Sequence, residues 1–252
     1  MTVAVVGGTG TLGALVVVDL LGRGERVAVL SRHAEGVPAG AEHRRVDLTD
    51  GAGLDLALDG VSAVIDAANA QKGARETLVE GTRRLLEAGA RAGVANHVTI
   101  SIVGIDRVPM SYYRTKLAQE EALEAGAVPW TLLRATQFHQ LLDSAFAAAA
   151  RFGVRPTGRA RLQPVDPAIV AARLAEAALA APAGRLPDLG GPRVQTLTEL
   201  SGAWATARGR RRLPLRVPAW GKIGRSLAAG ALCDERGAAP GEDFEEWLGH
   251  GR

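Results

Sequence analysis

The sequence predicts an α/β protein with a doubly wound parallel sheet and a small C-terminal lobe. Short apolar runs rich in β-branched residues alternate with segments of helical periodicity well past residue 130, as a parallel sheet covered on both faces requires. The first run, at residues 3–6, passes directly into a glycine-rich turn and an apolar helix. The length of 252 residues suits one domain of this kind.

The expected elements follow one another in a strand–helix alternation. Strands are expected at residues 3–6, 26–30, 43–46, 61–65, 97–103 and 130–133. Helices are expected at residues 14–21, 74–92, 111–125, 167–181 and 242–248. Ser111 and Asp166 occupy N-cap positions, and Pro167 suits a first helical turn.

The turn after the first strand contains three glycines with the spacing G-x-x-G-x-x-G, at Gly7, Gly10 and Gly13. A helix N-terminus offers free N–H groups and a partial positive charge, so it binds phosphate. Gly7 permits a sharp turn, Gly10 lets the backbone approach a pyrophosphate, and Gly13 lets the helix pack close to the strand. The position of the motif between strand and helix therefore predicts dinucleotide binding.

The end of the second strand predicts which dinucleotide binds. An NAD enzyme of this type usually carries Asp or Glu there, to accept from the ribose hydroxyls. This chain has Ser31 and Arg32 instead, followed by His33, which we expect at the surface. A hydroxyl and a guanidinium bind a 2′-phosphate, which a carboxylate would repel. We therefore expect NADP(H) rather than NAD(H), although a solvated Arg32 is the simpler alternative.

Tyr112 and Lys116 are four residues apart at the start of the helix after the fifth strand. This spacing puts them one turn apart on one helix face. A nearby ammonium stabilises a phenolate and lowers the tyrosine pKa toward a useful range for acid–base chemistry. The alternative is that Tyr112 packs and that Lys116 is a solvated residue paired with Glu120.

The turn Gly-Gly-Thr-Gly-Thr-Leu-Gly resembles the cofactor loop of extended and atypical short-chain dehydrogenases/reductases, which have a single Rossmann domain. Residues 78–86, 101–104, 112–116 and 131–138 are also similar to segments of NmrA-like or sugar-epimerase-like members. The resemblance implies that Thr9, Thr11 and Leu12 join the three glycines at the cofactor.

The same resemblance implies further site residues. It assigns an adenine contact to Asp47 and Leu48, and a loop on the nicotinamide side to Ala67, Ala68 and Asn69. It assigns the catalytic hydroxyl to Ser101, with Thr99 as the second choice, and a ribose contact to Lys116. Residues 135–138, which include Gln137, would approach the nicotinamide. Two features depart from the family. Leu78 stands where many members carry Asn, and the interval between Ser101 and Tyr112 is short.

Composition and charge bound the other properties. The net charge is +3, and no apolar run is long enough to span a bilayer. The single Cys233 has no disulfide partner, and the first strand leaves no room for a signal peptide, so we expect a cytoplasmic protein without a membrane partner or a metal. The basic segment 208–216 could bind nucleic acid or an anionic ligand, but a solvated segment is the simpler interpretation.

We expect a single Rossmann-type domain over residues 1–252, with a cofactor-binding core at 1–136 and a substrate-binding portion at 137–163 and 185–252. In that portion His139 is either a second acid or a helix-surface residue, and Trp204, Trp220 and Trp247 line a pocket or pack a lobe. Three functions stay open: an NADP(H)-dependent reductase of a small ketone or quinone, a nucleotide-sugar epimerase or dehydratase, and a non-catalytic NADP sensor. The sequence favours the reductase and leaves the oligomeric state open.

Overall fold

The computed structural model describes residues 1–70, 72–209 and 212–250. The chain forms two compact units. The first comprises residues 1–101, 114–133 and 170–186, and the second comprises 102–113, 134–169 and 187–252. Among the described residues, no helix is long and apolar enough to cross a membrane.

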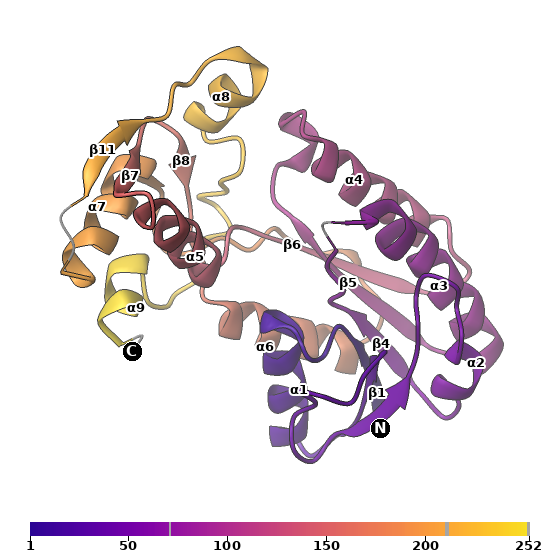
Figure 1. The fold of residues 1–252 in the computed structure, drawn as a ribbon. Helices are drawn as coiled ribbons and strands as arrows, with labels where there is room; N and C mark the ends of the chain where they lie inside the picture. The colour runs from indigo at the N-terminus through magenta and orange to yellow at the C-terminus, as the bar shows by residue number, and fades with distance from the viewer. Residues whose placement is uncertain (71, 210–211, 251–252) are drawn as a thin grey trace. The chain divides into compact units, whose positions relative to one another are not determined.

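A seven-stranded sheet forms the centre of the fold, with the strand order β3-β2-β1-β4-β5-β6-β9 (Figure 1). The strands are β1 (Thr2–Val6), β2 (Arg26–Ser31), β3 (Glu42–Arg45), β4 (Ala63–Asp66), β5 (Asn96–Ile102), β6 (Trp130–Ala135) and β9 (Gly184–Arg185). The pairings β3–β2, β2–β1, β1–β4, β4–β5 and β6–β9 are parallel. This arrangement confirms the predicted doubly wound fold of Rossmann type.

Helices cover both faces of this sheet. On one side lie α1 (Thr11–Gly22) and α6 (Pro167–Leu179), and on the other α2 (Leu54–Ala57), α3 (Gly81–Ala92) and α4 (Ser111–Glu124) (Figure 1). Arg23, at the C-cap of α1, lies 3.8 Å from Glu176 of α6, so these two helices are neighbours. A buried cluster that includes Leu30, Leu86 and Leu132 fills the space between the sheet and α3.

The register of the sheet brings three strand ends to one edge. Val6 pairs with Leu30 on one side and with Asp66 on the other, and Asp66 pairs with Thr99. The residues that follow these strands therefore lie at the carboxyl edge, which is where sheets of this class bind ligands.

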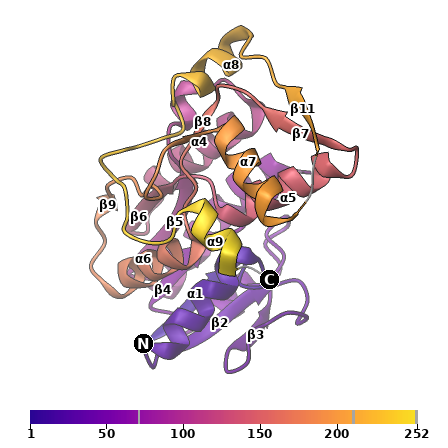
Figure 2. The ribbon, with the colours of Figure 1, turned by 90° about the vertical axis from the view of Figure 1, so that its left-hand side faces the viewer.

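The second unit packs helices around a separate aromatic core (Figure 2). Its elements are η2 (Ile105–Arg107), α5 (His139–Ala150), β7 (Val154–Thr157), β8 (Arg161–Leu162), β10 (Gln195–Thr196), α7 (Leu197–Ala207), β11 (Leu213–Arg216), α8 (Gly221–Ala228) and α9 (Phe244–His250). Strand β11 pairs in parallel with β7, and β10 pairs antiparallel with β8. Phe146, Trp204 and Phe244 form the core between α5, α7 and α9.

Several boundaries differ from the prediction. The helix expected at 74–92 is a π-helical segment η1 (Arg75–Glu80) followed by α3. The last helix begins at Phe244 rather than at residue 242, because the Asp243 carboxylate caps the N–H groups of Glu245 and Glu246. Helix α1 begins at Thr11, three residues earlier than expected, and α4 begins at Ser111 itself.

Candidate active site

The glycine turn has the geometry that the motif predicts. Gly7 has a φ of +72°, and a Cβ on it would lie 2.7 Å from the carbonyl oxygen of Ala67. A Cβ on Gly13 would lie 2.1 Å from the Gly7 carbonyl oxygen, so only glycine lets α1 start this close to the turn. The Gly10 N–H donates to the same carbonyl at 2.9 Å and closes the turn.

Gly10 meets a different environment. A Cβ there would contact only the Gly7 oxygen, at 3.3 Å. Gly10 is the N-cap of α1 and caps the helix without a side chain, while Thr9 and Thr11 are exposed and Leu12 is buried beneath them. The first N–H groups of a helix have no intrahelical acceptor. The turn therefore presents free donors and no Cβ at Gly10, and this arrangement fits a dinucleotide pyrophosphate.

The residues at the ends of β2 and β3 line a hollow of about 410 Å³, and Arg32, which the sequence predicts to bind a 2′-phosphate, is one of them. Arg32, His33, Arg45 and Asp47 contribute to its lining. His33 is exposed, as expected. The Ser31 hydroxyl donates to the His33 carbonyl at 2.6 Å, so it also fixes the strand end.

Arg45 is a residue that sequence analysis missed. It pairs in register with Ser31, because β3 runs parallel to β2, and its side chain is exposed at the hollow. The signal in the sequence was weak, since Arg45 lies in a short polar strand without an apolar run. The structure thus places two guanidinium groups, those of Arg32 and Arg45, around one hollow.

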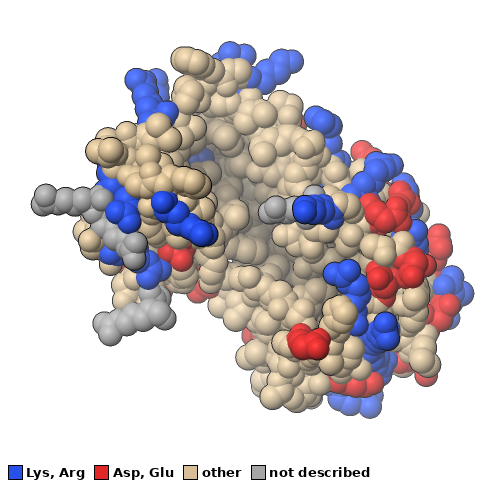
Figure 3. All heavy atoms as spheres, in the orientation of Figure 1, with Lys and Arg blue, Asp and Glu red and all other residues tan. Residues whose placement is uncertain are grey.

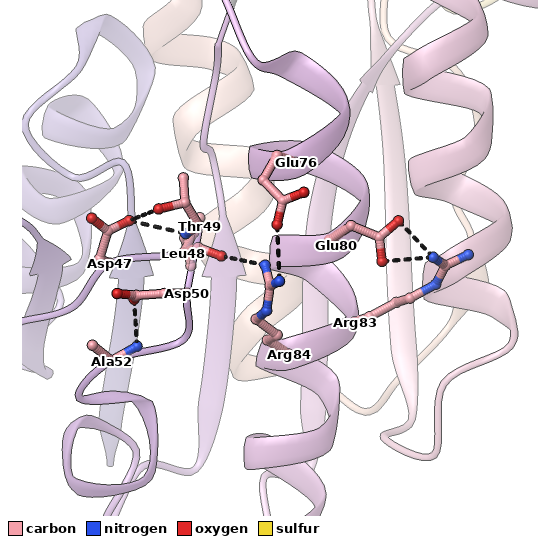
Figure 4. A network of polar contacts seen from close by, with 9 residues as sticks. All are labelled: Asp47, Leu48, Thr49, Asp50, Ala52, Glu76, Glu80, Arg83 and Arg84. Atoms are coloured by element: carbon pink, nitrogen blue, oxygen red, sulfur yellow. Dashed lines mark hydrogen bonds and ion pairs between the residues drawn. The ribbon is translucent and has the colours of Figure 1, made fainter.

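The loop after β3 is held by its own hydrogen bonds (Figure 4). Asp47 Oδ1 accepts from the Thr49 N–H at 2.9 Å and from its hydroxyl at 2.7 Å. These bonds, and then the charge of Arg32, hold the pKa of the Asp47 carboxyl below its usual range. The Leu48 carbonyl accepts from Arg84 of α3 at 3.0 Å, which fixes Leu48 against that helix.

The loop after β4 packs on the glycine turn. The Ala67 N–H donates to the Val6 carbonyl at 3.1 Å, and the Ala68 N–H donates to Asp66 Oδ1 at 3.0 Å. Ala67 and Ala68 are half-buried, and Asn69 is exposed. The structure therefore brings this predicted loop next to Gly7 at the carboxyl edge of the sheet.

Lys116 is buried, with 4% of its surface exposed, so the alternative of a solvated lysine is wrong. Its Nζ donates to the Ile100 carbonyl at 2.8 Å and to Gln119 Oε1 at 2.5 Å. Burial lowers the pKa of Lys116 to about 8, against the opposing charges of Asp66 and Glu120. The amine is thus poised to change charge near neutral pH.

A buried polar chain extends from this lysine to the fourth strand. Gln119 Nε2 donates to Asp66 Oδ2 at 3.2 Å and to Thr82 Oγ1 at 3.1 Å. The Thr82 hydroxyl donates to the same Asp66 oxygen at 3.1 Å. Sequence analysis did not identify Asp66, Thr82 or Gln119, because they belong to three separate elements whose meeting depends on the fold.

Two buried hydroxyls on β5 stand without a hydrogen-bond partner in the described part of the chain. These are Ser101 Oγ, the expected catalytic hydroxyl, and Thr99 Oγ1, the second choice. Alternate residues of a strand share a face. Buried hydroxyls normally find partners, so this pair has hydrogen-bonding capacity that the described residues leave unused.

Tyr112 and Tyr113 lie in the part of α4 that belongs to the second unit, and their ring centroids are 6.2 Å apart. Burial raises the pKa of the Tyr112 phenol, and the neighbouring Tyr113 adds to this effect. The expected lowering by Lys116 is therefore wrong: desolvation outweighs any charge effect at this phenol. A phenol with a raised pKa holds its proton at neutral pH, and it can donate that proton.

Gln137 and His139, the next two candidate residues, are held in place by contacts within the second unit. Gln137 Nε2 donates to the Leu232 carbonyl at 3.1 Å, and its Oε1 accepts from the Gln163 N–H at 3.1 Å. His139 is fully buried edge-on against Phe244 and Trp247, so the helix-surface interpretation is wrong. Burial lowers the pKa of its imidazole.

The tryptophans divide between packing and exposure. Trp204 packs in the aromatic core and donates to Asp143, which also accepts from Arg208 at 2.9 Å. Trp220, in contrast, is exposed. Within the basic segment 208–216, residues 210 and 211 lie outside the described part of the chain.

Comparison with known proteins identifies the family. The model of the NAD(P)H-binding family matches residues 7–180, which is more than half of the chain. The chain belongs to this family. The match begins at the glycine turn and includes every predicted cofactor residue, and it confirms the resemblance stated above.

The proteins that this chain resembles have three different kinds of function. Photosystem II assembly factor Ycf39 of Trieres chinensis is 30% identical over 156 residues, which are 58% of this chain and 49% of that protein. The match thus spans about half of the relative's length. NADPH-dependent quinone oxidoreductase QOR2 of Escherichia coli, solved with NADPH, superposes with a TM-score of 0.83 at 22% identity, over 98% of this chain and 99% of that one. A nucleoside-diphosphate-sugar epimerase of Staphylococcus aureus superposes with a TM-score of 0.78 at 15% identity, over 99% and 100%.

Proposed function

We propose that this protein is an NADP(H)-dependent oxidoreductase that reduces a ketone or quinone of a small organic molecule. The observation that carries the proposal is the pair of exposed guanidinium groups, Arg32 and Arg45, around the hollow at the ends of β2 and β3. Guanidinium groups bind phosphate through charge-assisted hydrogen bonds. Two carboxylates also line this hollow, those of Asp47 and Asp50. Asp47 accepts from Thr49, and Asp50 accepts from the Ala52 N–H.

Each predicted residue has a defined role in this proposal. The turn Gly7–Gly13 holds the pyrophosphate, and Arg32 with Arg45 holds the 2′-phosphate. Lys116 and Ser101 contact the nicotinamide end, and Tyr112 donates the proton that the reduced carbonyl oxygen requires. The bound nicotinamide supplies the hydride. The similarity to a quinone oxidoreductase solved with NADPH supports this reaction class.

A non-catalytic NADP sensor is the second candidate. The contacts of Lys116 favour it, since Ile100 and Gln119 already accept from the amine. The similarity to a photosystem assembly factor also supports it. A function as a nucleotide-sugar epimerase has weaker support. Arg208, a candidate for binding an anionic sugar nucleotide, pairs with Asp143.

Two measurements test the proposal. Calorimetric titration should give tighter binding of NADPH than of NADH, and Arg32→Ala should weaken NADPH by about 1.5–3 kcal/mol while NADH changes little. Arg91→Ala is the matched control, since Arg91 pairs with Asp55 away from the hollow. Incubation with NADPH and a panel of ketones and quinones should then consume the reduced cofactor. Equal affinities refute the NADP preference, and tight binding without turnover favours the sensor.

A further inference from the structure

One segment of the second unit combines basic charge with exposed apolar side chains. Between residues 200 and 233 the sequence contains no Asp or Glu and seven basic residues. Of the ten large apolar side chains exposed in the described part of the chain, five lie between Leu213 and Ile223. We call this set the basic apolar patch, and it consists of Leu213, Leu215, Val217, Trp220 and Ile223 with Arg216, Lys222 and Arg225.

The local structure keeps these side chains in solvent. Every residue of β11 is exposed, although the strand pairs with β7 through its backbone. Leu213 and Leu215 are alternate residues of β11 and therefore share a face, and Val217 follows directly after the strand. Helix α8 buries none of its residues. Figure 3 shows Lys and Arg side chains, and no Asp or Glu, around α8 at the top of that view.

Trp220 is the most exposed large apolar residue of the patch. It is 83% exposed, while Trp130, Trp204 and Trp247 are buried or half-buried. Water-facing tryptophan costs free energy, but at the boundary between lipid headgroups and acyl chains its ring meets both environments that it favours. Lys and Arg on the same surface extend their charges toward headgroups while their stems cover apolar surface.

We propose that the basic apolar patch docks this protein on an anionic lipid bilayer surface. The combination of apolar side chains with basic residues suits such an interface, where apolar insertion and electrostatic attraction add together. We expected no membrane partner because the chain lacks a bilayer-spanning run, and surface docking needs no such run.

Charge complementarity separates this occupant from two others. A symmetric contact with a second copy would place one patch against its twin, basic against basic, which repels. A nucleic acid would satisfy the arginines but leaves Leu213, Leu215 and Val217 in water, because phosphate contacts dominate such binding. An anionic bilayer satisfies both kinds of side chain.

Vesicle flotation of the full chain tests the proposal. The protein should float with vesicles of phosphatidylglycerol and phosphatidylcholine in equal parts, and not with phosphatidylcholine alone. The combined variant Leu215→Ser, Trp220→Ser should lower binding about tenfold or more. Neutralising Arg216, Lys222 and Arg225 to Gln should lower it about a hundredfold. Leu56→Ser is the matched control, since Leu56 is equally exposed in α2 and should change nothing.

Tryptophan emission locates the contact. Emission should shift to shorter wavelength when the anionic vesicles are added, and Trp220→Leu should abolish the shift while keeping flotation. Failure to float, or equal flotation with neutral vesicles, overturns the proposal. Binding to a DNA duplex without flotation assigns the patch to nucleic acid instead, and concentration-dependent dimerisation without flotation assigns it to a second copy. Cofactor titration is independent of every one of these outcomes.

Discussion

Lys116 shows how a single buried charge is balanced. Desolvation disfavours the ammonium, while Asp66 and Glu120 favour it, and the result is a pKa of about 8. The ordinary lysine pKa is about 10.4. Between these two values the unfolded chain therefore binds the proton that the folded chain has released, so stability rises with pH through this window. Below about pH 8 the burial penalty is fully present.

This linkage predicts a measurable pH dependence of stability. From about pH 7 to about pH 9.5, the titration of Lys116 should raise the free energy of unfolding by about 2 kcal/mol. The Lys116→Met variant lacks this contribution. Urea unfolding at both pH values gives the free energy of unfolding of the native protein and of the variant. The difference between these two free energies should change by about 2 kcal/mol from the lower to the higher pH. A difference that stays constant with pH would mean that burial does not lower the pKa of Lys116, because equal proton binding in the folded and unfolded chains gives no pH dependence.

Tyr112 carries the chemical prediction at the same scale. If its protonated phenol donates to the substrate, Tyr112→Phe should lower kcat by roughly 10²–10⁴-fold with little change in cofactor affinity. Tyr113→Phe is the matched control, and its rate should stay nearly unchanged. Lys116→Ala should reduce both kcat and cofactor affinity. Steady-state kinetics separate these results, and full activity of Tyr112→Phe would show that the proton comes from Ser101, from water or from the substrate.

At the scale of elements, three glycines of the strand–turn–helix unit β1–α1 differ in what a side chain would meet there. Gly13 serves packing, because its missing Cβ makes room for the Gly7 carbonyl. Gly10 leaves space that the polypeptide itself hardly occupies. A Cβ on Gly22, the last residue of α1, would have no atom of the described residues within 4 Å beyond its own neighbours in the helix. The three positions therefore separate folding, ligand binding and neutral substitution within one element.

Substitution of these glycines should give three distinct results. Gly10→Val should abolish NADPH binding and preserve the circular dichroism spectrum, because the branched side chain occupies the pyrophosphate space. Gly22→Val should leave NADPH binding unchanged. Gly13→Ala should lower the melting temperature, since its Cβ would overlap backbone. Calorimetric titration of the Gly10 variant decides the point, and retained affinity would place the phosphate elsewhere.

At the scale of the whole molecule, cofactor binding should be visible as stability. A ligand that binds only the folded chain stabilises it by about 2.7 kcal/mol at a hundredfold excess over Kd. For a chain of this size we expect a rise in melting temperature of several degrees, roughly 5–10 °C for this free energy. NADPH should raise the melting temperature more than NADH at equal concentration in a thermal unfolding scan. The reverse order would contradict the roles of Arg32 and Arg45.

The sequence by itself determined the elements whose signal is local. The apolar run before Gly7 predicted a buried strand, and Gly7 has a positive φ that side-chain-bearing residues rarely adopt. The alternation of strands and helices then predicted the sheet. The boundaries shifted where a capping contact decides them, as Asp243 does for α9. The two-residue strand β9 was missed, because a segment that short has no periodicity to detect.

Only the tertiary structure decided which polar groups meet. The sequence allowed a solvated Lys116, but its amine donates to Ile100 and Gln119 in the interior. Asp66, on a distant strand, accepts from Gln119 and favours the charged amine through its own charge. Arg45 joins Ser31 and Arg32 only because parallel strands set their register. Sequence patterns encode which side a residue faces within its own element. The dielectric and the charges around that residue come from other elements, and these depend on the fold.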